Sequence, residues 1–169
     1  GQYEKAFPEM ADEFKRRKAD LLPKGWDLGL AEYPAGKSVA TRKVSEEILQ
    51  VLGKNIPELI GGTADLNNSV FAWLKGMGDF QKPGEKPPGV QGAVGGEWGY
   101  GGRNIHFGVR EHAMGSISNG LAAYGGLLPF TGTFFVFSDY MRPPIRLAAI
   151  SQLHVLFIFT HDSIGGGED

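Results

Sequence analysis

A glutamate between an apolar segment and a helix is the strongest candidate for chemistry in this chain. Glu111 follows the strand-like residues 104–107 and precedes residues 112–124, whose many small side chains predict a closely packed helix. In open α/β sheets, ligands bind where strands end and helices begin. The pattern leaves two interpretations open: an acid that contacts a ligand, or an ordinary acidic residue in the first turn of a helix.

Three aromatic residues follow the next expected strand, residues 128–135. Phe134, Phe137 and Tyr140 are spaced three apart across the end of that strand and the start of the following helix. Aromatic side chains in such a pattern most often belong to a core. Because their strand neighbours the segment that ends at Glu111, the alternative is that they line the same crevice.

Several familiar catalytic and binding motifs are incomplete. Residues 36–38 spell Gly-Lys-Ser, but a phosphate-binding loop needs a glycine five residues earlier, where Ala31 stands. The glycine-rich residues 95–102 do not fit the dinucleotide-binding pattern. Residues 161–163 spell His-Asp-Ser, yet consecutive side chains diverge and cannot form a triad. The four histidines lack ligand spacing, so no metal site is predicted within this chain.

The elements that must position these residues alternate between strands and helices. The expected strands cover residues 57–62, 104–107, 128–135 and 154–160, and the expected helices cover residues 38–52, 112–124 and 138–150. Pro143 and Pro144 are expected to kink or delay the last helix. Residues 75–102 form a long loop, which is typical of a functional or disordered segment. The alternation predicts an α/β fold, a parallel sheet flanked by helices.

Composition limits the class of protein. A length of 169 residues suits one domain with an additional arm, and a net charge of −2 argues against nucleic-acid binding. The absence of cysteine excludes disulfides and thiolate chemistry and fits a reducing compartment. The most apolar run, residues 155–159, is too short to cross a membrane, and residues 1–25 lack a secretory signal. We therefore expect a cytoplasmic protein without nucleic-acid or membrane partners.

Five segments together resemble the pyrimidine-binding domain of the transketolase family, in order and approximate spacing, over about residues 36–169. They are Ala-Thr-Arg-Lys at 40–43 with Ser-Glu at 45–46; Gly-Gly-Thr-Ala-Asp-Leu at 61–66; Gly-Val-Arg-Glu-His-Ala-Met-Gly at 108–115; Gly-Thr-Phe at 132–134 with Phe137 and Tyr140; and Thr-His-Asp-Ser-Ile-Gly at 160–165 with Gly-Glu-Asp at 167–169. The resemblance implies the pyrimidine domain of a thiamine-diphosphate-binding fold.

The resemblance gives Glu111 a specific task. In transketolases the matching glutamate hydrogen-bonds N1′ of the cofactor's aminopyrimidine, which favours the imino tautomer that removes the C2 proton. Phe134, Phe137 and Tyr140 would stack on the pyrimidine ring. The implied enzyme is a transferase that moves a two-carbon ketol unit from a ketose phosphate to an aldose phosphate, as in the pentose phosphate pathway and the Calvin cycle.

The resemblance also implies substrate-binding residues. Arg42, Ser69 and His161 match the family's sugar-phosphate ligands, and their guanidinium, hydroxyl and imidazole groups suit a dianion. Asp65 matches a residue beside the thiazolium ring, and Asp169 matches the acid that binds a substrate hydroxyl.

Other parts of the implied enzyme are missing from these residues. The resemblance places the diphosphate and its Mg²⁺ or Ca²⁺ on an N-terminal domain, and it implies a third domain and a homodimer with the cofactor at the subunit interface. We therefore expect a fragment: residues 1–35 would be the linker from the missing diphosphate-binding domain. Residues 36–169 would be the pyrimidine-binding domain, truncated at its C-terminal end. The fragment alone would be inactive.

Related functions remain as alternatives. The matches at residues 112–115 and 64–66 favour transketolase over deoxyxylulose-phosphate synthase, but they barely separate it from dihydroxyacetone synthase. Another thiamine-diphosphate enzyme is a further possibility. The alternative from a different class is a non-catalytic α/β module that binds a ligand or partner without performing chemistry.

Overall fold

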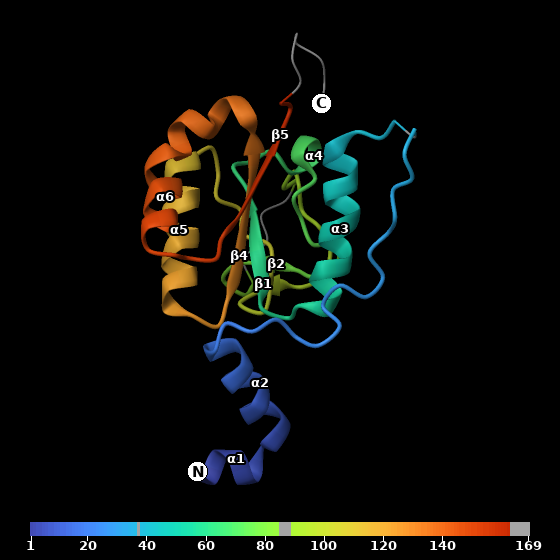
Figure 1. Cartoon of the computed structure of the whole chain (residues 1–169). Helices are drawn as coiled ribbons and strands as arrows, with labels where there is room; N and C mark the ends of the chain where they lie inside the picture. Colours follow the sequence, from blue (N-terminus) through green and yellow to red (C-terminus); the bar gives the residue numbers. More distant parts are fainter. Residues whose placement is uncertain (37, 85–88, 163–169) are drawn as a thin grey trace.

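A parallel sheet forms the centre of the molecule (Figure 1). The computed structural model describes residues 1–36, 38–84 and 89–162. The main sheet contains β1 (Leu59–Thr63), β4 (Leu128–Phe134) and β5 (Leu156–Thr160), in the order β1-β4-β5. Two short strands, β2 (Asp79–Phe80) and β3 (Trp98–Gly99), also pair in parallel. The predicted α/β fold with a parallel sheet flanked by helices is therefore confirmed.

Helices cover both faces of this sheet (Figure 1). The helices are α1 (Gln2–Ala6), α2 (Pro8–Lys18), α3 (Thr41–Asn55), α4 (Asn67–Val70), α5 (Glu111–Tyr124), the 3₁₀ turn η1 (Phe135–Phe137) and α6 (Ser138–Ile150). On the α3 side, Leu49 packs with Leu59 and Phe130 in one buried cluster. On the α5 and α6 side, Met114 and Met141 pack in a second cluster. The helices α1 and α2 form an arm outside the layers.

The expected strand over residues 104–107 is wrong. Asn104 alone pairs as an isolated bridge, to Gly61 of β1 and to Asp79 of β2. Its buried side-chain amide bonds the backbone of Leu74 and Gly78, which holds the chain close to the loop. After Ile105 the chain leaves the sheet and turns toward α5. The strand therefore stops because the segment serves as a junction between two short sheets.

Close backbone approach explains a glycine in β1. A Cβ atom at Gly62 would lie 2.1 Å from the carbonyl oxygen of Ile105. No side chain fits at that distance, so glycine allows the segment around Ile105 to run directly beside the strand.

Element boundaries differ from expectation by a few residues. The helix expected from residue 38 begins at Thr41 and continues to Asn55. Pro143 and Pro144 lie inside a continuous α6, with neither a delayed start nor a break. The side-chain amide of Asn119 on α5 donates a 2.8 Å hydrogen bond to the carbonyl oxygen of Pro144, which ties the two helices together at this point.

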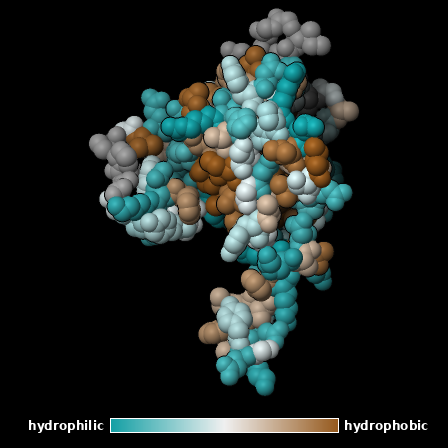
Figure 2. Space-filling view, turned by 90° about the vertical axis from the view of Figure 1, so that its left-hand side faces the viewer, coloured by the Kyte–Doolittle hydropathy of each residue, from teal (hydrophilic) through white to brown (hydrophobic). Residues whose placement is uncertain are grey.

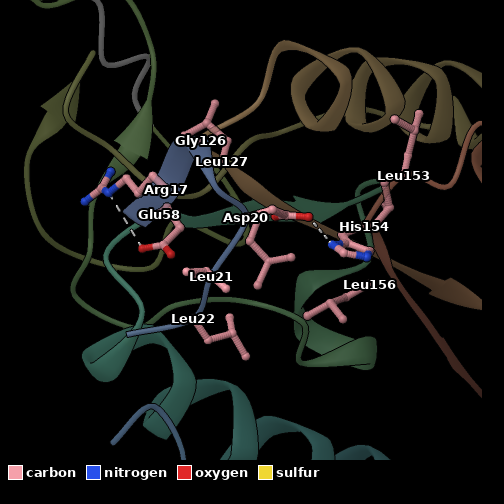
Figure 3. A pocket seen from close by; sticks show the side chains of 12 residues that line it. Arg17, Asp20, Leu21, Leu22, Glu58, Gly126, Leu127, Leu153, His154 and Leu156 are labelled. Carbon is pink, nitrogen blue, oxygen red and sulfur yellow. Dashed lines mark ion pairs between the residues drawn. The ribbon is translucent and has the colours of Figure 1, made fainter. Parts of the chain in front are cut away.

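An ion-pair network attaches the arm to the amino-terminal edge of the sheet. The guanidinium of Arg16 donates two hydrogen bonds, of 2.7 and 2.9 Å, to the buried carboxylate of Glu58. The same guanidinium also binds Glu13. Beside this network lies a cavity of about 450 Å³, rich in leucine side chains; the pair Arg17–Glu58 lies at one side and the pair Asp20–His154 at the other (Figure 3).

Close packing between α5 and α6 predicts a stability effect. A Cβ atom at Gly115 would lie 2.7 Å from Cγ of Pro144, whose ring is rigid. Gly115→Ala should therefore lower the free energy of unfolding by about 1–3 kcal/mol, measured by urea denaturation. The control is Gly120→Ala on the same helix, where nothing lies within 4 Å. It should raise stability by about 0.5–1 kcal/mol, and equal effects at the two positions would contradict the packing.

The arm's attachment should depend on pH. The hydrogen bond from Arg16 lowers the pKa of Glu13 from 4.5 to about 2, despite partial desolvation. A carboxyl with a lowered pKa contributes stability above its unfolded pKa and loses it as pH falls through the folded value. Protection of α2 amides from hydrogen exchange should therefore decrease between about pH 5 and pH 2. Glu13→Gln should show a weaker pH dependence; an unchanged dependence would rule out this pair as its source.

Candidate active site

The carboxyl ends of the three main strands converge at the edge opposite the arm. Glu111 is the first residue of α5 and is 8% exposed. It lines a cleft of about 670 Å³ together with Phe137, Tyr140 and residues that follow β1, Ala64 and Leu66. The structure therefore places the candidate carboxylate and two of the candidate aromatic residues around one cleft.

Local backbone geometry places Glu111 at the cleft. Gly108 has a positive φ of 69°, which turns the chain from the sheet toward α5. The Arg110 side chain folds back and donates a 2.9 Å hydrogen bond to the carbonyl oxygen of Phe107. Within residues 1–36, 38–84 and 89–162, no group donates a hydrogen bond to the Glu111 carboxylate. A carboxylate that lines a cleft and is bonded by no described residue can accept a hydrogen bond from a ligand, so this position suits an acid that binds one.

The three aromatic residues form a continuous row. The rings of Phe134 and Phe137 stack with centroids 5.9 Å apart, and those of Phe137 and Tyr140 lie 6.3 Å apart. Phe137 and Tyr140 line the cleft, whereas Phe134 packs behind Phe137. The ring centroids of Phe134 and His161 lie 3.9 Å apart. Phe134 thus connects the aromatic wall to a second group of candidate residues.

Arg42 and His161 meet although they lie 119 residues apart. Arg42 stands at the start of α3 and His161 directly follows β5, and Nη1 of Arg42 lies 2.9 Å from Nε2 of His161. The Phe71 ring lies beneath the Arg42 guanidinium, 5.8 Å from its central carbon. An arginine and an imidazole at the ends of two elements form a suitable site for an anion.

Asp65 and Ser69 lie in a separate polar pocket. They line a cavity of about 170 Å³ with Asn68 and His106. Leu66 lines both this pocket and the Glu111 cleft, so the two spaces adjoin. The last candidate, Asp169, lies outside the described residues.

Sequence reasoning missed a pair formed by a partly buried histidine and a buried aspartate beside the polar pocket. Nε2 of His106 lies 2.6 Å from Oδ1 of Asp79, and the Trp98 ring stacks on the imidazole. The available signal was weak: a histidine between two apolar residues, in a segment taken for a strand. Asp79 and Trp98 belong to the long loop, whose pattern gave no indication of their partners.

The described residues contain neither a metal-binding cluster nor a membrane-spanning helix. In the described parts of the chain, no group of three or more histidine, aspartate or glutamate side chains is arranged to hold a metal ion. Among the same residues, no helix has the length and apolar character needed to cross a membrane.

The fold and the cleft place the chain in a broad class, the open α/β domains that bind ligands. A parallel sheet with a cleft at the carboxyl ends of its strands is the ligand-binding arrangement of open α/β domains. Residues 37–169 match the family model described as the transketolase, pyrimidine binding domain. The chain therefore belongs to this family.

Individual relatives agree with the family match. The chain is 49% identical over 168 residues to a transketolase of Halalkalibacterium halodurans and 48% identical over 167 residues to one of Geobacillus stearothermophilus. Each alignment covers 99% of this chain and 23% of the relative. The chain thus spans about a quarter of the length of these relatives.

Solved structures give the same result. A transketolase of Pichia stipitis in complex with sedoheptulose-7-phosphate has a TM-score of 0.81 and 43% identity, covering 98% of this chain and 23% of that one. A Campylobacter jejuni transketolase has a TM-score of 0.74 and 40% identity, covering 94% and 22%. Both identities are high enough for the likeness to extend beyond the fold.

The left-handed backbone at Asp65 predicts that glycine stabilises the fold more than alanine at this position, the reverse of the usual order. Its φ of 65° is left-handed, a conformation that costs a side chain about 1–2 kcal/mol. Asp65→Gly should therefore be more stable to urea than Asp65→Ala by about 1–2 kcal/mol, although both remove the carboxylate. Ser116, an exposed residue inside helix α5, is the control, where the glycine variant should be less stable than the alanine variant by about 1 kcal/mol. The same order at both positions would contradict strain at Asp65.

Proposed function

We propose that this chain is the pyrimidine-binding part of a transketolase that transfers a two-carbon ketol unit from a ketose phosphate to an aldose phosphate. The observation that carries the proposal is the Glu111 carboxylate, buried beside Phe137 and Tyr140 with no hydrogen-bond donor among the described residues. Membership of the transketolase family supports the reaction type.

The cleft fits one end of thiamine diphosphate. A carboxylate that lacks a partner suits the ring nitrogen N1′ of the aminopyrimidine, and the aromatic wall suits stacking on that ring. Apolar Ala64 and Leu66 line the cleft and would exclude water. When bound, the cofactor supplies the carbanion chemistry needed to move a two-carbon unit. Glu111 would bind N1′ and select the ring tautomer, while Phe137 and Tyr140, backed by Phe134, would hold the ring in place.

The remaining candidates are proposed to bind the rest of the ligands. Arg42, His161 and Ser69 would bind the phosphate of the sugar, and Asp65 would lie beside the thiazolium ring. Asp169 would bind a substrate hydroxyl. Structures of Pichia stipitis transketolase have been solved in complex with xylulose-5-phosphate and with sedoheptulose-7-phosphate. These complexes support sugar phosphates as the substrate class.

A homodimer would complete the site. Figure 2 faces α5 and α6 and shows hydrophobic side chains gathered over the middle of this side. Val109 beside the cleft is 75% exposed, and Ile117, Leu147 and Ile150 on α5 and α6 are about half exposed or more. A second subunit would bury these side chains and cover the cleft, because contiguous exposed apolar surface marks interaction sites.

The proposal divides the work within a longer enzyme. Residues 1–35 would connect a diphosphate-binding domain, which would carry the Mg²⁺ or Ca²⁺, to the pyrimidine-binding domain of residues 36–169. The isolated chain would be catalytically inactive, because it would supply only one part of the cofactor site. We propose a cytoplasmic enzyme, although some relatives, such as transketolase-1 of Arabidopsis thaliana, are chloroplastic.

Replacing Glu111 tests the proposed function. In the full-length enzyme, Glu111→Ala should lower kcat by about a hundredfold to ten-thousandfold, because tautomer control is lost. Unfolding by urea should show little loss of stability, since no described residue hydrogen-bonds the carboxylate that the variant removes. Glu111→Gln separates charge from shape and should remain strongly impaired. The control is Glu47→Ala, an exposed glutamate on α3, which should keep normal turnover; normal turnover in Glu111→Ala would reject the proposal.

A further inference from the structure

A histidine–aspartate pair lies beside the polar pocket. Nε2 of His106 is 2.6 Å from Oδ1 of Asp79, whose side chain is only 3% exposed; the His106 side chain is 20% exposed. The Trp98 ring stacks on the imidazole with centroids 5.8 Å apart and planes within 17°. The imidazole is therefore held on its edge by a carboxylate and on one face by an indole.

The backbone around this pair fixes its position. Asp79 lies in β2, and the next residue, Phe80, donates a 2.7 Å backbone hydrogen bond to the carbonyl of Asn104. Asn104 in turn bonds Gly78 and bridges to β1. His106 follows Asn104 by two residues, so its ring and its carboxylate partner are carried by segments that are themselves joined.

The pair faces a pocket that adjoins the Glu111 cleft. His106 lines the cavity of about 170 Å³ with Asp65, Asn68 and Ser69. The long loop also closes this cavity, because the Asn67 amide donates a 2.9 Å hydrogen bond to the carbonyl of Gly92. Since Leu66 lines both spaces, a ligand in the polar pocket would lie next to one in the cleft.

We propose that His106 is a further substrate-binding residue, which hydrogen-bonds a hydroxyl group of the sugar phosphate, and that Asp79 is its positioning residue. The inference rests on the proposed function and adds a contact to it. When the carboxylate of Asp79 accepts a hydrogen bond from Nε2–H, Nδ1 is the ring nitrogen left to hydrogen-bond a hydroxyl group. The long loop thereby contributes to substrate selection.

The charges around the pocket favour a hydroxyl over a phosphate. Asp65 brings a carboxylate to the same pocket, and a phosphate dianion beside it would be repelled. A polyol can donate to a carboxylate and exchange hydrogen bonds with the Asn68 amide and the Ser69 hydroxyl. The guanidinium of Arg42 does not line this pocket and lies instead with His161. Of the three residues proposed to bind the phosphate, Ser69 lines this pocket, whereas Arg42 and His161 do not.

Donor substrates with and without phosphate test this assignment. In the full-length enzyme, His106→Ala should raise KM about five- to twentyfold for xylulose 5-phosphate and by the same factor for unphosphorylated xylulose, with a smaller change in kcat. Arg42→Ala should raise KM for the phosphorylated donor alone. His154→Ala is the matched control, because this exposed histidine lies at the opposite edge of the sheet and should leave both KM values unchanged.

Two more variants separate contact from folding. His106→Gln keeps a hydrogen-bond acceptor and should recover part of the loss in KM, whereas a purely structural histidine would show no such rescue. Asp79→Asn should raise KM for both donors less than His106→Ala, because it disturbs only the ring's orientation.

Unchanged KM values in the His106 variants of an active enzyme would overturn this inference, as would an increase confined to the phosphorylated donor. Normal turnover in Glu111→Ala would instead reject the proposed function, so the two failures are distinguishable.

Discussion

The buried amide of Asn104 joins the two halves of the structure. Its side chain is 1% exposed, accepts a hydrogen bond from the Leu74 backbone, and donates to the carbonyls of Leu74 and Gly78. Its backbone bridges β1 and β2. A buried amide satisfied in this way is hard to replace, since removing one partner leaves the others unpaired. Asn104 therefore fixes the position of the long loop, residues 75–102, relative to the main sheet.

Arg103, the preceding residue, reinforces this junction. Its guanidinium donates hydrogen bonds of 2.8–2.9 Å to the carbonyls of Gly53, Ile56 and Leu59. A cation at the C-terminal end of α3 satisfies carbonyls that the helix leaves free and interacts well with the helix dipole. The burial that this requires lowers the pKa of Arg103. Two consecutive side chains thus connect the loop to the sheet and to α3.

The sequence was sufficient for the parts of the fold that depend on local pattern. The apolar runs that became β4 and β5, and the helical periodicity of α3, are set by residues close in the chain. Glu111 could be singled out because the junction of an apolar run and a helix is visible in sequence. Its roles and those of the aromatic residues remain proposals, but the structure does gather Glu111, Phe137 and Tyr140 around one cleft.

Other features depend on contacts between distant residues and could not be predicted. Residues 104–107 looked like a strand, but the amide of Asn104 uses partners 26 and 30 positions earlier. His106 gave no sign of Asp79, which lies 27 positions away in a loop without periodicity. The separation of Ser69 from the Arg42–His161 pair likewise arises from three-dimensional packing.

The position of the arm has a consequence for how such a domain can evolve. Arg16 and Glu58 meet at the amino-terminal edge of the sheet, while every described candidate for ligand binding lies at the other edge. The length of the strands separates the two. Mutations that change how the arm attaches can therefore accumulate at one edge without altering the candidate ligand-binding residues at the other. Attachment of the arm and ligand binding at the candidate site are thereby open to selection as nearly independent traits of the same small sheet.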